Sequence, residues 1–235
     1  MSAEVTPWCQ NCGADAPAKF CPECGQSTTV ALPTLWGFLQ EAVGAFFSYD
    51  HKLWATLRAL VLHPGQLTVD YVEGKRVRYL APFQLLLWLQ ALTFLAFQLY
   101  FNPAAGSSER QSRAVLIIGV FFAVTLALLH LRSGLRFILH FIAALHLWAF
   151  LMVLLLAEYI LVPWGSVALH KLHLVHGFLP LGLYVTHSVE LVMTVYITLA
   201  LRRIYQSALL VAFFKTLLLL AAYLAFMKLF PFAAL

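Results

Sequence analysis

Four cysteines near the start of the chain form its clearest chemical pattern. Cys9 and Cys12 are separated by two residues, Cys21 and Cys24 repeat this spacing, and a glycine follows each pair. Each Cys-x-x-Cys-Gly segment is expected to form a tight turn, and two of these turns can bring four thiolates to one ion. Four sulfur ligands give a tetrahedral Zn²⁺ site with no open position. The pattern therefore predicts a structural zinc knuckle within residues 1–33 and not a catalytic metal site.

Two other uses of these cysteines remain open. A pair of disulfides would require an oxidising compartment, and an iron centre can use the same ligands. A segment this short cannot bury a core, so a bound metal would contribute most of its folding free energy, on the order of 10 kcal/mol. One lysine against three acidic residues gives the first 34 residues a charge of −2, which argues against binding to nucleic acid.

The rest of the chain is too apolar for a water-soluble protein. Apolar residues make up 62% of the 235 residues and charged residues only 11%, and the mean hydropathy is +0.84. Soluble domains carry roughly a quarter charged residues. The whole chain has a net charge of +5, and the part after residue 34 carries +7; there, lysine and arginine beside apolar runs indicate membrane topology.

Five apolar runs are long enough to cross a bilayer, for which about 20 helical residues are needed. We therefore expect an all-α integral membrane protein with five transmembrane helices in residues 80–235. The expected spans are Leu80–Phe101, Ala114–Leu131, Phe137–Leu161, Phe178–Leu201 and Ala208–Phe230.

Basic residues gather at one set of span ends, and they predict the orientation. The positive-inside rule places that side, and the N-terminus, in the cytosol and the C-terminus outside. The reducing cytosol also suits four metal-binding thiolates. The N-terminus is polar and does not resemble a signal peptide. The residues on the cytosolic side are Lys75, Arg76, Arg78, Arg132, Arg136, Arg202 and Arg203.

Residues 34–79 are expected to form amphipathic helices that lie on the inner interface or dock under the bundle. Apolar residues repeat at helical spacing in 35–47 and again in 53–61, after Asp50 as a candidate N-cap. Pro64 can open a third helix and Gly74 can close it. Lys75, Arg76 and Arg78 would then contact lipid headgroups, at roughly 1 kcal/mol each.

An ionisable side chain inside a span costs free energy, so we expect it to have a hydrogen-bonding or charged partner or a functional role. Counted from the cytosolic ends of their spans, His146 and Glu190 share a depth of about 15 Å, and His187 lies one turn from Glu190. These three residues can form a proton relay or a cation site, or they can make hydrogen bonds that fix helix packing. His140 lies closer to the cytosolic interface and can snorkel towards it.

Several motifs resemble a widespread family of bacterial membrane proteins of unassigned function. The double Cys-x-x-Cys opening, His63-Pro64-Gly65 and the run from Tyr71 to Tyr79 (Tyr-x-x-Gly-x-Arg-x-x-Tyr) carry the resemblance, followed by His140, His146 and Arg202-Arg203. The resemblance implies a polytopic protein of the bacterial inner membrane with a cytosolic metal knuckle, and it implies no reaction.

We find no enzyme signature such as a Walker loop or a GxSxG elbow. The sequence favours a non-catalytic accessory, scaffold or assembly subunit that contacts membrane lipids and a membrane-protein partner or further copies of itself. A small transporter of protons, metal or solute is the alternative. A lipid-directed enzyme using histidine as a base is a third hypothesis, for which the chain supplies few polar residues.

Overall fold

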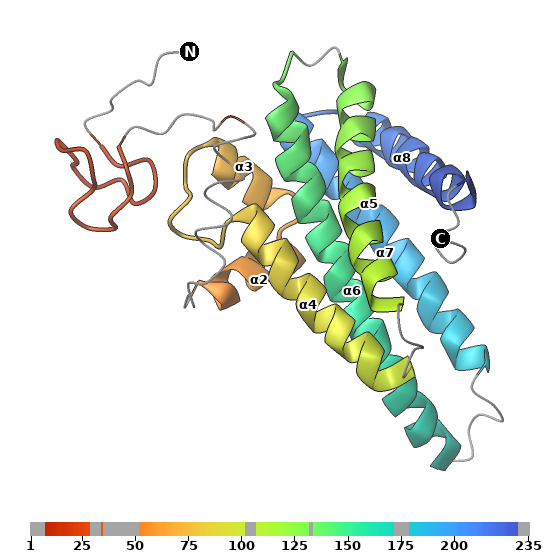
Figure 1. Ribbon diagram of the computed structural model, residues 1–235. Helices are drawn as coiled ribbons and strands as arrows, with labels where there is room; N and C mark the ends of the chain where they lie inside the picture. Colours follow the sequence, from red (N-terminus) through yellow and green to blue (C-terminus); the bar gives the residue numbers. More distant parts are fainter. Residues whose placement is uncertain are drawn as a thin grey trace.

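The computed structural model describes residues 8–28, 34, 52–101, 107–131, 134–171 and 179–229. Within these ranges the regular structure is helical, apart from two isolated β-bridges near the N-terminus. The expected all-α class is therefore confirmed (Figure 1). The helices are α2 (Leu53–Leu62), α3 (Gln66–Val72), α4 (Pro82–Phe101), α5 (Ser107–Leu129), α6 (Phe137–Lys171), α7 (Leu179–Tyr205) and α8 (Leu209–Leu229).

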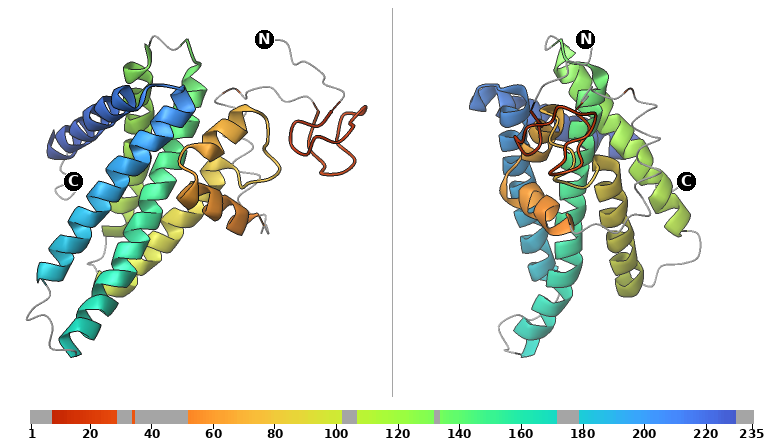
Figure 2. Two further views of the ribbon diagram at one scale, coloured as in Figure 1. Left: turned by 180° about the vertical axis from the view of Figure 1, so that it is seen from behind. Right: turned by 90° about the vertical axis from the view of Figure 1, so that its left-hand side faces the viewer.

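Helix α6 is the centre of the bundle and packs against α4, α5 and α7 (Figures 1 and 2). Its sequence is apolar on every side, which is typical of a helix with neighbours all round. Ala143, Ala144 and Ala149 are completely buried, and small residues of this kind let helices approach closely. Phe150 of α6 also stacks on Tyr196 of α7 with a ring separation of 3.4 Å.

In the described part of the chain, three helices are long and apolar enough to cross a membrane, by length and composition. They contain Pro82–Leu99, Phe137–Ile160 and Leu209–Phe226. Each of the five expected spans coincides with one helix from α4 to α8, but the bounds differ, some helices being longer and some shorter than the apolar run. Thus α5 begins at Ser107, and α6 extends to Lys171.

Helix α8 crosses the bundle obliquely instead of running alongside α7 (Figures 1 and 2). Near its middle, Thr216 accepts a hydrogen bond from Thr198 of α7 at 3.1 Å. Ten residues further along α8, Phe226 stacks on Phe121 of α5 at 4.3 Å. Most of the apolar surface of α8 is therefore left exposed, and the outside location of the C-terminus stays a prediction.

Helices α2 and α3 dock on the side of the bundle, against α6 and α7. Tyr196 donates a hydrogen bond to the Leu60 carbonyl at 2.7 Å, and Arg203 donates one to the Pro64 carbonyl at 2.9 Å. Of the two expected locations for this segment, the structure shows docking on protein. The first expected amphipathic stretch, 35–47, lies outside the described residues.

The ends of these two helices correct part of the sequence analysis. Lys52 is the N-cap of α2, whereas Asp50 lies outside the described residues. Pro64 does not open α3, because Gly65 intervenes as the N-cap in the left-handed conformation with φ of 77°. The role of Gly74 is confirmed, since it follows the last residues of α3 with φ of 89°.

Gly65 is the contact point between this segment and α7, which gives a testable prediction. A Cβ atom at residue 65 would lie 2.9 Å from the backbone oxygen of Ala200 and would occupy a strained backbone conformation. We expect Gly65→Ala to destabilise the protein by at least about 1–3 kcal/mol, measured by thermal unfolding in detergent. Gly119→Ala is the control, because a Cβ there meets nothing within 4 Å; an equal loss in both variants would contradict the assignment.

Candidate metal centre and intramembrane polar residues

The two Cys-x-x-Cys turns have the same backbone structure. In each turn the first cysteine donates its N–H to the carbonyl five residues on, Ala14 or Gln26, at 2.8 Å. The glycine after each pair donates to the first cysteine's carbonyl and adopts a φ above 70°. Only a glycine takes this conformation without strain, so both predicted glycine roles are confirmed.

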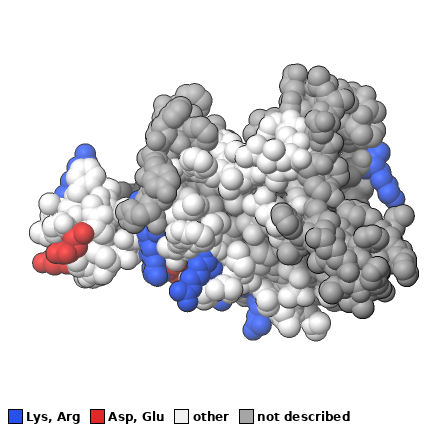
Figure 3. All heavy atoms as spheres, turned by 90° about the horizontal axis from the view of Figure 1, so that it is seen from below, with Lys and Arg blue, Asp and Glu red and all other residues white. Residues whose placement is uncertain are grey.

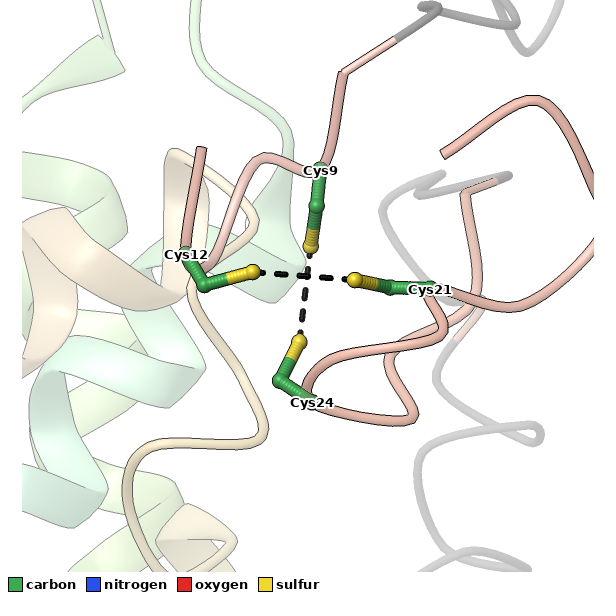
Figure 4. A group of neighbouring side chains, drawn as sticks. All are labelled: Cys9, Cys12, Cys21 and Cys24. Carbon is green, nitrogen blue, oxygen red and sulfur yellow. Dashed lines mark hydrogen bonds between the residues drawn. The ribbon is translucent and has the colours of Figure 1, made fainter. Parts of the chain in front are cut away.

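The four sulfur atoms point towards one centre (Figure 4). They lie within 4.8 Å of one another, with Cys9 3.5 Å from Cys24 and Cys12 3.6 Å from Cys21. A disulfide requires about 2.05 Å, and the cysteines are all free. Four thiolates around an ion at roughly 2.3 Å would be separated by distances of the observed size, so the donor set and spacing fit a tetrahedral metal ion.

The protonation of these cysteines also favours a cation. Burial opposes ionisation of Cys24, but hydrogen bonds at the Gln26 backbone and the Asn11 side chain lower its pKa to about 7. A backbone hydrogen bond at Ala14 lowers the pKa of Cys12, yet burial and the three neighbouring sulfurs raise it to about 12. Four thiolates therefore need a positive ion at their centre to be ionised together.

Gln26 joins the knuckle to the segment between α3 and α4. Its buried side chain donates from Nε2 to the Gly74 carbonyl at 2.7 Å. Its Oε1 accepts from the backbone N–H groups of Arg76 and Val77 at 3.1 and 3.3 Å. The sequence analysis missed this residue, because a glutamine two positions after a metal-binding cysteine carries no recognisable signal.

The residues expected at lipid headgroups are engaged with their neighbours. Lys75 forms ion pairs with Asp70 at 3.3 Å and Glu73 at 2.6 Å, and these carboxylates raise its pKa. The guanidinium of Arg76 lies over the Tyr71 ring, and that of Arg78 lies over Tyr79. In Figure 3, basic side chains gather where the knuckle meets the helices, while most of the described bundle surface in view is uncharged. Anchoring to lipid stays a prediction.

His146 has a buried partner that the sequence did not suggest. Its Nδ1 lies 2.9 Å from the Thr68 hydroxyl, so the bond joins α6 to α3 across 78 residues of sequence. Both side chains are almost completely buried. This contact fits the packing hypothesis for His146.

Glu190 does not lie near His146 in the structure. The Phe150–Tyr196 stack sets the register of the antiparallel helices α6 and α7. His146 lies four residues from the stack towards one end, and Glu190 lies six residues towards the other, so about 15 Å separates them along the axis. Glu190 is exposed on α7, and the side chain of His187 lies outside the described residues. The expected equal depth was wrong because it took Phe137 and Leu201 as level, whereas the stack sets Phe137 level with a point beyond Tyr205, the last residue of α7.

His140 belongs to a second polar group, at the end of the bundle where α6 begins. Its Nδ1 lies 2.8 Å from the Tyr205 hydroxyl, and the Tyr205 ring stacks on His130 at 3.5 Å. His130 donates from Nδ1 to the Leu126 carbonyl at 2.9 Å. The interpretation of His140 as a snorkelling side chain is corrected, since it is buried and bound within the protein.

A pocket of about 510 Å³ adjoins this second group. Three of its seven lining residues are leucines and four carry a polar group. The sequence analysis did not consider Lys215 or Ser207. The sequence did offer one signal for this site, because Lys215 is a basic residue within the last apolar run. The pocket is lined by Leu128, Leu129, His130, Leu131, Tyr205, Ser207 and Lys215.

Comparisons with known proteins give one family match. A family model described as "Protein of unknown function (DUF3667)" matches residues 50–94, which contain α2, α3 and the first part of α4. No curated protein and no solved structure matches the chain. The match confirms a family of unknown function for residues 50–94, the range in which the His63-Pro64-Gly65 turn and the Tyr71–Tyr79 motif lie, and membership of a widespread bacterial family stays a prediction.

The hydrogen bonds of Gln26 predict that this side chain holds the knuckle on the segment between α3 and α4. Gln26→Ala removes the acceptor of the Arg76 and Val77 amides, so we expect these amides to exchange with deuterium about tenfold faster. Metal content should not change, since no ligand is lost. Gln10→Ala, a glutamine change in the other turn, is the control. Unchanged exchange after Gln26→Ala would contradict the contact.

Proposed function

We propose that this chain is a non-catalytic membrane protein, an accessory, scaffold or assembly subunit of a larger complex in the bacterial inner membrane. Helices α4 to α8 span the membrane, and the N-terminal knuckle holds a structural zinc ion in the cytosol. The C-terminus lies in the periplasm. The basic residues at one set of helix ends and the cysteine-only ligand set support this orientation.

One observation carries the proposal: polar side chains inside the bundle make hydrogen bonds that join helices. Thr93 of α4 bonds to its own helix and also donates to the Met152 carbonyl of α6 at 3.3 Å. Thr198 and Thr216 join α7 to α8, as Thr68 and His146 join α3 to α6. Such groups serve packing, and they do not form a chain of exchangeable sites across the bundle.

The outward apolar surface supports a partner within the membrane. The exposed apolar residues include Leu191 and Val195 on α7 and Leu210, Phe214 and Leu218 on α8. Oblique packing leaves most of the α8 surface exposed, so lipid or another protein must cover it. A second copy of this chain or a different membrane protein can fill that position.

Transport is the alternative function, and it requires ionisable groups that face one another. In the described residues, the candidate groups are separated: His146 is bound to Thr68, and Glu190 lies on the exposed side of α7. The scaffold proposal is therefore better supported than transport through a His146–Glu190 site.

The knuckle predicts the metal content of the protein. Purified chain should contain about one zinc ion per molecule, measured by inductively coupled plasma mass spectrometry. Cys12→Ser removes one of four ligands and should abolish retention of zinc and lower the abundance of the protein. Glu23→Gln, which changes an exposed carboxylate beside the site, is the control and should retain the ion. Equal zinc in all three proteins would contradict the proposed site.

The scaffold proposal predicts a defined complex. After gentle extraction of the tagged chain from its own membranes, mass spectrometry should find a membrane protein in stoichiometric amounts. The same complex should persist in Glu190→Gln, because the carboxylate has no transport role in this proposal. A monomer without partners would contradict the scaffold function. A homo-oligomer whose proton or metal flux in proteoliposomes is lost in Glu190→Gln would establish transport instead.

A further inference from the structure

We propose that the pocket between the ends of α5 and α7 and the start of α8 binds the phosphate of an anionic phospholipid, with Lys215 as the cation. The inference is independent of the scaffold role and requires only that the bundle lies in a membrane. The lining residues of this pocket come from the end of α5, the end of α7 and the first two turns of α8.

Lys215 provides the main argument, because it lies in the second turn of α8, a helix that is otherwise almost entirely apolar. It is half-buried and forms no ion pair among the described residues. The chain contains no acidic residue from 111 to 157 and none after Glu190, so the segments that form the pocket cannot supply one. Asp70 and Glu73, at the end of α3, form ion pairs with Lys75.

A charge in such a helix is costly unless it finds a counter-ion or water. A bound anion would offset this cost, and the surroundings show what kind of anion fits. Ser207 provides a second polar group: its Oγ is buried and makes no hydrogen bond in the described part of the chain. This hydroxyl can donate to a phosphate oxygen beside Lys215.

His130 also lines the pocket. Because Nδ1 of His130 donates to the Leu126 carbonyl, the lone pair of the neutral ring lies on Nε2.

The remaining lining is apolar and indicates a lipid. Leu128 and Leu131 are both more than half exposed, and they continue the pocket onto the outer surface of α5. The exposed Arg202 and Arg203 in the last turn of α7 mark the same end of the bundle as a headgroup region. A phosphate at Lys215 would therefore have acyl chains directed along an apolar face.

The test compares lipid retention in variants of the full chain. Protein is reconstituted in phosphatidylcholine vesicles that contain phosphatidylglycerol, extracted again and examined by native mass spectrometry. We expect the unaltered chain to retain phosphatidylglycerol and Lys215→Met to lose it roughly tenfold. Lys215→Arg should retain it. Lys228→Met changes an exposed lysine on the same helix outside the pocket and should have no effect.

Two further measurements test the pocket by a second variant and distinguish a lipid from a soluble phosphate compound. Ser207→Ala should weaken retention several-fold, so the proposal stays testable if Lys215→Met fails to fold. Inorganic phosphate is added to delipidated protein in a thermal-unfolding measurement. Stabilisation that depends on Lys215 without retention of phosphatidylglycerol would assign the pocket to a soluble phosphate compound and overturn the lipid. Equal retention by the unaltered chain and Lys215→Met would overturn the site.

Discussion

The requirement that buried polar groups find partners governs how this apolar chain is assembled. Inside the bundle there is no water to satisfy an imidazole or a hydroxyl, so an unpaired group would cost about 1–3 kcal/mol. The bond between Thr68 and His146 meets this requirement by joining α3 to the central helix α6. The Tyr196 hydroxyl similarly joins α7 to α2 through the Leu60 carbonyl. The short helices α2 and α3 are thus part of the bundle and not only a membrane-surface attachment.

The same principle connects the knuckle to the bundle. Gln26 is buried, and its amide satisfies three backbone groups of the segment that leads from α3 into α4. The metal would fix the two turns, Gln26 would fix the next segment, and Thr68 would fix α3 on α6. A metal site that catalyses nothing can in this way determine the position of a membrane domain, which agrees with a scaffold role. The one matched family model covers the docked part of this connection, residues 50–94.

The sequence predicts the local features of this fold well. Cysteine spacing predicts four sulfurs around one centre, and apolar runs predict α4 to α8, because both depend on neighbouring residues. Contacts between distant segments have no such signal. Thr68 and His146 are 78 residues apart, and nothing in either surrounding sequence indicates the other. The expected His146–Glu190 contact was wrong for a related reason, since a shift of a few residues at the end of α7 changes which residues face each other.

The most direct test of this account is a double-mutant cycle on Thr68 and His146, measured by unfolding in detergent. Thr68→Val and His146→Phe are made singly and together, so that each removes one partner while keeping most of the side-chain volume. The account predicts that the losses in unfolding free energy are not additive, with a coupling of about 1 kcal/mol or more. Additive losses, with a coupling near zero, would show that the bond does not hold α3 on α6 and would contradict the account.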